Sequence, residues 1–142
     1  MSCDGKIKPP GGRLFETDLI TISHSVPPAQ NKGFMIVQPK RHVEHIAELT
    51  KEEMSDLSQA IHNTAKAITK ALKPEKVYVC SFGETVKHVH FHVLPRYSNM
   101  PKRGITVLTQ ILDQGLYRPT QQEAEEAARQ VKKELLKLYK AR

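Results

Sequence analysis

The chain has 142 residues, of which 39% are hydrophobic and 26% are charged, so it has the length and composition of a single globular domain. Its net charge of +7 favours anionic ligands, and because no basic run is interleaved with aromatic residues, we expect small phosphate-bearing molecules and no nucleic acid. The two cysteines, Cys3 and Cys80, are too few for a disulfide framework. No apolar run approaches the ~18 residues of a membrane span, and residues 1–20 lack an apolar signal region. We therefore expect a cytoplasmic protein with no membrane partner.

The N-terminal part of the chain predicts an arm followed by short strands. Residues 1–12 are rich in Gly, Pro and Lys and are expected to form a flexible arm, with residues 13–142 as a single domain. Residues 14–22 have the pattern of two short strands, and residues 33–38 that of a strand ended by Pro39.

A capping box marks the start of a long helix. In Thr50-x-x-Glu53 each side chain satisfies an unpaired backbone N–H of the other residue, so the sequence predicts a helix over residues 51–72. Apolar residues recur along this helix at helical spacing, and we expect them to form one stripe against the sheet. The residues of this stripe are Met54, Leu57, Ile61, Ala65, Ile68 and Leu72.

The C-terminal part predicts a hairpin and a second helix. Residues 77–80 have the pattern of a strand that pairs with the histidine-rich strand after it. Residues 105–116 carry no clear pattern. A second capping box, Thr120-x-x-Glu123, predicts a helix over residues 120–141. Strands and helices in this order indicate an α+β fold with an antiparallel sheet.

Three histidines, His88, His90 and His92, alternate with apolar residues. Alternation is typical of a half-buried strand, so the imidazoles are expected to share one face while the apolar side chains pack on the core. On a regular strand the outer two lie ~13 Å apart at Cα, too far for all three to bind one zinc ion at ~2.0–2.1 Å. The pattern favours an anion site in which a phosphate centred on His90 is reached from both sides. The alternatives are a metal site completed by other ligands and a histidine-rich surface without chemistry.

These residues resemble the motif of the histidine triad (HIT) family of nucleotide hydrolases and transferases. Residues 88–94, HVHFHVL, look like the family's His-x-His-x-His-x-x, and residues 83–86, GETV, resemble its Gly-Gln-Ser/Thr-Val lead-in. Residues 94–96, LPR, look like the fragile histidine triad branch of dinucleoside polyphosphate hydrolases. The resemblance covers roughly residues 13–100. It implies a HIT-like fold, in which an antiparallel sheet packs beside the long helix, and a homodimer.

The resemblance also implies a role for each histidine. His90 is the nucleophile that attacks the α-phosphate of a nucleotide substrate and forms a nucleotidyl-histidine, which water resolves. Neutral imidazole is competent for this step near neutral pH. His88 and His92 orient the nucleophile and bind the phosphate oxygens. Thr85 takes a hydroxyl position near the phosphates, and Ser23 or His24 falls where the family binds the ribose.

Several positions depart from the family pattern. Glu84 stands where the family has glutamine, and its carboxylate repels phosphates, which puts the leaving group in question. Phe34 stands where many relatives have a histidine, and His24 is a candidate to take the place of that missing histidine. Cys3 lacks the second cysteine of zinc-binding relatives, so we expect neither a metal nor a cofactor and interpret His42 and His45 as surface or dimer contacts. The alternative functions are a nucleotide-binding sensing module with little turnover and a metal-dependent hydrolase.

Overall fold

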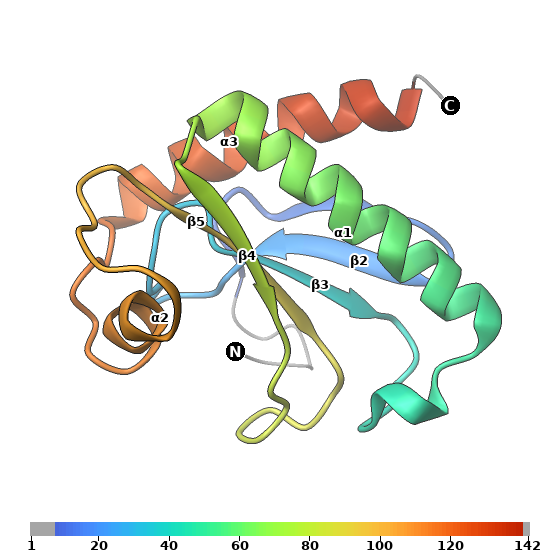
Figure 1. Cartoon of the computed structure of the whole chain (residues 1–142). Helices are drawn as coiled ribbons and strands as arrows, with labels where there is room; N and C mark the ends of the chain where they lie inside the picture. The colour runs from blue at the N-terminus through green and yellow to red at the C-terminus, as the bar shows by residue number, and fades with distance from the viewer. Residues whose placement is uncertain (1–7, 141–142) are drawn as a thin grey trace.

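A five-stranded antiparallel sheet organises residues 8–140, the part of the chain that the computed structural model describes (Figure 1). In chain order the elements are β1 (Arg13–Glu16), β2 (Ile20–His24), β3 (Met35–Pro39), η1 (Ile46–Glu48), α1 (Lys51–Leu72), β4 (Lys76–Cys80), β5 (Phe91–Arg96), α2 (Gly104–Leu112) and α3 (Gln121–Lys140). The strand order across the sheet is β1-β2-β3-β5-β4, and every neighbouring pair is antiparallel. The predicted α+β fold is therefore confirmed, as is the pairing of β4 with β5.

Helices cover the two faces of the sheet unequally. α1 and α3 contact each other and pack on one face, where they bury strand residues such as Met35 and Val93 in the larger core cluster. α2 packs on the other face, where Val107 and Ile111 meet Phe34 in a second cluster. In Figure 1, α1 and α3 run along one side of the sheet and α2 lies apart from them. The second face is therefore only partly covered by a helix.

The helix α1 begins at the predicted capping box, and every residue of the predicted stripe except Met54 is buried in the core or packed against it. Thr50 Oγ1 accepts the Glu53 N–H at 3.1 Å, and Glu53 Oε1 accepts the Thr50 N–H at 2.8 Å. Leu57 is fully buried as expected, whereas Met54 is 38% exposed and Ile61 is only half-buried. The buried residues are Glu53, Leu57, Ala60, Asn63, Thr64, Ala67 and Ile68. The predicted stripe is wrong at Met54, and because α1 packs against both the sheet and α3, its buried face also includes small and polar residues.

The remaining segments differ from expectation mainly at their ends. The second capping box opens α3, and residue 141 of the predicted helix lies outside the described part. Most of α2, which runs from Gly104 to Leu112, falls in residues 105–116, where the sequence showed no clear pattern. Of the expected flexible arm, residues 1–7 lie outside the described part. Residues 8–12 instead form a turn that packs against α3. In this turn the Gly12 N–H donates to Pro9 O at 2.9 Å, and Gly11 lies against Ala128. Within residues 8–140, every helix is too short or too polar to cross a bilayer.

Candidate active site at the histidine cluster

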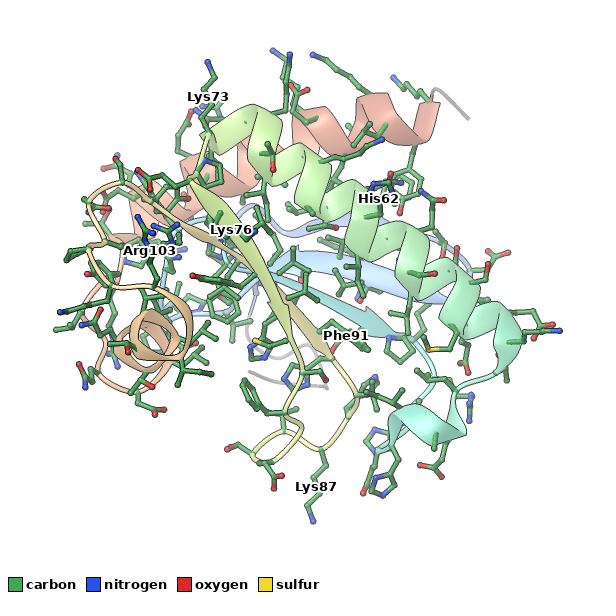
Figure 2. The ribbon with its side chains drawn as sticks, viewed as in Figure 1. His62, Lys73, Lys76, Lys87, Phe91 and Arg103 are labelled. Atoms are coloured by element: carbon green, nitrogen blue, oxygen red, sulfur yellow. The ribbon has the colours of Figure 1, made fainter. Side chains whose placement is uncertain are left out.

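The three histidines gather where a loop enters β5. The expectation of one regular strand is wrong at its start, because β5 begins at Phe91 and residues 81–90 form a loop; His88 and His90 therefore lie in the loop and only His92 in the strand. The alternation nevertheless holds, since Val89, Phe91 and Val93 are all buried in the core beneath α1. Lys87, at the tip of this loop, points away into solvent (Figure 2).

His90 is held in one orientation by the backbone. Its Nδ1 lies 2.8 Å from the carbonyl oxygen of His88. A carbonyl only accepts hydrogen bonds, so Nδ1 carries the proton and Nε2 of the neutral ring keeps its lone pair. The residue is 5% exposed, and its ring centroid is 4.8 Å from that of His92. The geometry therefore presents Nε2 as a base or a nucleophile.

His88 fastens the loop to the end of β3. Its Nε2 lies 2.8 Å from the carbonyl oxygen of Pro39, to which it donates. One residue further on, the Val89 N–H donates to Val43 O at 2.7 Å, and the exposed His42 ring meets His88 edge-on at 5.1 Å. Burial lowers the pKa of His88, so its neutral form is favoured. These contacts position the carbonyl that orients His90.

A half-exposed ion pair between Arg41 and buried Glu53 holds the segment after β3 in place. Arg41 donates to both carboxylate oxygens of Glu53, at 2.8 and 3.1 Å, and to the Glu48 carbonyl at 3.0 Å. The guanidinium of Arg41, helped by the backbone N–H of Thr50, lowers the pKa of Glu53 to about 2. The start of α1 thereby anchors the segment that receives the hydrogen bonds of the histidine loop.

His92 has two buried ring nitrogens without a hydrogen-bond partner among the described residues. Its ring centroid lies 5.0 Å from that of Phe34 and 6.3 Å from that of Phe82. Burial in this apolar setting, followed by the proximity of His90, lowers its pKa to about 4, so the ring is neutral at pH 7. Because buried polar atoms are nearly always partnered, the unpartnered nitrogens mark a place for a polar ligand.

The two candidate ribose-binding residues lie on opposite faces of the sheet. Ser23 pairs with Ile36, and Ile36 pairs with His92, so half-buried Ser23 shares the histidine face two strands away, ~10 Å from His92. His24 points to the helix side, since successive strand residues face opposite ways. It is fully buried: its Nδ1 donates to Ser25 O at 3.1 Å and its Nε2 accepts the Gly33 N–H at 2.9 Å.

The assignment of His24 to the nucleotide site is therefore wrong, and this histidine does not replace the one that Phe34 displaces. Phe34 itself is 1% exposed and forms an apolar wall against His92. Thr85 and Glu84 are exposed in the loop between β4 and β5. The sequence motif gave no sign of the carbonyls of His88 and Pro39, whose roles depend on the folded backbone.

Within residues 8–140, no three His, Cys, Asp or Glu side chains are grouped as a metal site, and Cys3 lies outside this range. His42 and His45 are both exposed, and His42 lies 3.6 Å from Glu44. Cys80 is half-buried and pairs with His92 across the two strands.

Comparison with known proteins identifies the family. The family model described as HIT domain matches residues 8–99, most of the chain, so the chain belongs to the HIT domain family, which confirms the resemblance of the histidine motif. The Bis(5'-adenosyl)-triphosphatase of Dictyostelium discoideum is 40% identical over 73 residues, which cover 45% of this chain and 46% of that protein. The Adenosine 5'-monophosphoramidase hnt1 of Schizosaccharomyces pombe is 33% identical over 89 residues, covering 59% of this chain and 63% of that protein.

The chain spans about half the length of the first curated relatives it matches. Among solved structures, the Hit-like protein involved in cell-cycle regulation from Bartonella henselae superposes with a TM-score of 0.70 at 22% identity, covering 93% of this chain and 90% of that chain. This likeness confirms the HIT-like fold.

Proposed function

We propose that this protein is a nucleotide hydrolase or nucleotidyl transferase that acts at the α-phosphate of a nucleoside phosphate derivative. The observation that carries the proposal is the 2.8 Å hydrogen bond from His90 Nδ1 to the His88 carbonyl, because it leaves the lone pair on Nε2 of a ring held in one orientation. The named activities of the two relatives above support the same class of substrate.

The proposed reaction has two displacements at phosphorus. First, the Nε2 lone pair of His90 attacks the α-phosphorus; the bond to the leaving group breaks, and its electron pair goes to the leaving atom, which takes a proton from solvent. Next, water attacks, the phosphorus–nitrogen bond breaks with its electron pair returning to Nε2, and the proton of water goes to solvent. A second acceptor in place of water gives the transferase reaction.

The neighbours of His90 stabilise charge rather than form bonds to phosphorus. A phosphate oxygen only accepts hydrogen bonds, so the single N–H of the neutral His92 ring and the Thr85 hydroxyl are suited to donate to it, with Ser23 on the ribose side. The Nδ1 of His88 keeps its lone pair while Nε2 donates to Pro39, so His88 acts by orienting His90. Loss of one positioned donor typically lowers the rate by ~10²–10³-fold. Loss of the nucleophile lowers it by on the order of 10⁶-fold.

The test is the turnover of adenosine 5'-phosphoramidate and diadenosine triphosphate by wild type and by His90→Ala, His88→Ala and His92→Ala. We expect His90→Ala to fold, to bind nucleotide and to lose turnover, whereas the two flanking variants remain slow but measurable. An acid-labile nucleotidyl adduct should map to His90 by mass spectrometry. An adduct on either flanking histidine, or a tenth of wild-type activity in His90→Ala, would refute the mechanism. Binding without turnover in wild type would favour a sensing module instead.

Three further properties belong to the same proposal. We expect full turnover after exhaustive chelation; activity that vanished and returned with zinc would favour a metal-dependent hydrolase. We also expect a homodimer, so light scattering should give twice the chain mass of 16.1 kDa at micromolar concentration, and a mass of one chain would remove this part of the proposal. The location proposed for the protein is the cytoplasm, which fractionation of its source cells would test.

A further inference from the structure

A groove of about 410 Å³ runs beside the histidine cluster along α2. Its lining residues are Phe82, Glu84, Ile105, Leu108, Thr109, Leu112 and Asp113. Phe82 is shared between the groove and the cluster, since its ring meets that of His92 edge-on at 6.3 Å. The volume is within the ~300–1,000 Å³ range of small-ligand sites. One wall is α2, which lies beyond residues 8–99 that match the family model.

The helix α2 presents apolar residues on two sides. Val107 and Ile111 are fully buried against the sheet. The groove residues that follow Ile105 on α2 lie 3, 4, 7 and 8 positions after it, so all five share one face of the helix, separate from the face buried against the sheet. On this face Ile105 is 78% exposed. A surface helix normally has one apolar face. Leu108 and Leu112 on this face are half-buried against the second cluster, whereas Ile105 is open to solvent, so the exposed part of the face is suited to cover an apolar ligand.

The groove wall is held in place at both ends of α2. The Gly104 N–H donates to the Tyr78 hydroxyl at 2.8 Å, and Gln30 Nε2 donates to the Leu112 carbonyl at 2.9 Å. The wall therefore needs little reorganisation when a ligand enters.

The charge of the groove is opposite to that of the chain as a whole. Glu84 and Asp113 are the ionisable side chains among the residues that line it, although the chain carries +7. Asp113 is the C-cap of α2, where the helix dipole adds negative charge and an acidic side chain is unfavourable for the helix. Arg103 is the N-cap residue at the opposite end of α2, ~15 Å away along the axis. The groove is thus complementary to an apolar group with a positive end.

We propose that this groove binds the leaving group of the substrate and selects an apolar amine, with Glu84 and Asp113 favouring a cationic end and disfavouring an anionic one. The proposal depends on the proposed function, since the amine departs as the α-phosphorus bonds to His90. It assigns Glu84, which replaces the family's glutamine, to the choice of leaving group: a polyphosphate chain meets repulsion here, whereas an ammonium group meets two carboxylates.

The test uses adenosine 5'-phosphoramidates that differ only at the far end of one six-carbon chain. The amines are 1,6-diaminohexane with a free ammonium, hexylamine with a methyl end, and 6-aminohexanoate with a carboxylate. Unsubstituted adenosine 5'-phosphoramidate has nothing to place in the groove and serves as the reference. We expect kcat/KM to fall from ammonium to methyl to carboxylate, with the outer two separated by about tenfold or more.

Two variants and one control assign the effect to the groove. Glu84→Gln should move the ratio of kcat/KM for the ammonium compound to kcat/KM for the carboxylate compound toward one, and should change kcat/KM for the reference by no more than about twofold. As the control, Glu52→Gln at an exposed position of α1 should leave the ratio unchanged. Ile105→Ser should lower kcat/KM for the hexylamine compound about three- to tenfold and leave the reference unaffected; the exposure of Ile105 makes a folding defect a minor concern.

The outcomes separate this inference from the proposed function. Turnover of the reference with equal rates for all three chain ends, or with a preference for carboxylate, would overturn the groove assignment and leave the His90 mechanism standing. An ammonium preference that Glu84→Gln does not reduce would likewise overturn it. If the protein turned over none of the four compounds and no diadenosine triphosphate, the proposed function would be overturned and this inference with it.

Discussion

Replacement of His24 separates a structural histidine from a nucleotide-binding one. In His24→Leu, the Gly33 N–H loses its acceptor at 2.9 Å and the Ser25 carbonyl loses its donor at 3.1 Å. Gly33 cannot shift to find another partner, because its α-carbon is enclosed: a Cβ there would lie 2.5 Å from the Leu72 side chain and 2.9 Å from the Tyr97 hydroxyl. Each buried polar group left unpaired costs ~1–3 kcal/mol, so we expect a loss of ~2–6 kcal/mol in unfolding free energy.

The matched variant is His24→Gln, whose Oε1 is able to accept from Gly33 while the bond to Ser25 is lost, so about half of that loss is expected. Both free energies are measured by urea unfolding followed by circular dichroism. Folded His24→Leu should keep kcat/KM for adenosine 5'-phosphoramidate within about twofold of wild type. The neighbouring Ser23→Ala, on the histidine face, should instead raise KM with little change in stability. A His24→Leu protein as stable as wild type but with a tenfold higher KM would refute this reasoning and return His24 to the nucleotide site.

Three further predictions concern α1 and the pH dependence of stability. Leu57→Ala should lower the unfolding free energy by ~2–5 kcal/mol and Met54→Ala by less than ~1 kcal/mol; equal losses would mean that the buried face of α1 is misplaced. Glu53→Gln should lower the unfolding free energy by ~1–3 kcal/mol near pH 7, whereas the control Glu52→Gln should lower it by less than ~0.5 kcal/mol. The difference between the two variants should vanish as pH falls from 4.5 to about 2, the pKa at which Glu53 of the folded protein takes up its proton. The pKa of His92 is lowered from 6.5 to about 4 in the folded protein, so as pH falls the unfolded chain takes up this proton first. The unfolding free energy should therefore decrease by up to ~1.4 kcal/mol per pH unit as pH falls from 6.5 toward 4. His92→Gln should have a shallower slope in this window, and an unchanged slope would contradict the assignment.

The sequence alone determined those features that depend on residues close together in the chain. Both capping boxes require only a side chain and a backbone N–H three residues apart, so the starts of α1 and α3 followed from Thr50 and Thr120. The side-chain alternation around Phe91 likewise separates histidines from core residues through local backbone geometry alone. The fold class followed from the order of such local elements, and the histidine motif pointed to the family before any contact was known.

The tertiary structure decided everything that depends on contacts between distant segments. The register of β2 against β3 turned His24 inward and Ser23 toward the histidines, a choice that a shift of one residue would reverse. Packing of α1 against α3 as well as the sheet turned Met54 outward. The orientation of His90 depends on a carbonyl that Pro39 positions through His88, 49 residues away in the chain. The groove beside Phe82 exists because α2, which has no clear pattern in the sequence, docks on the second face of the sheet. Such arrangements depend on strand register and on the fit of surfaces, and neither is encoded in any short stretch of the chain.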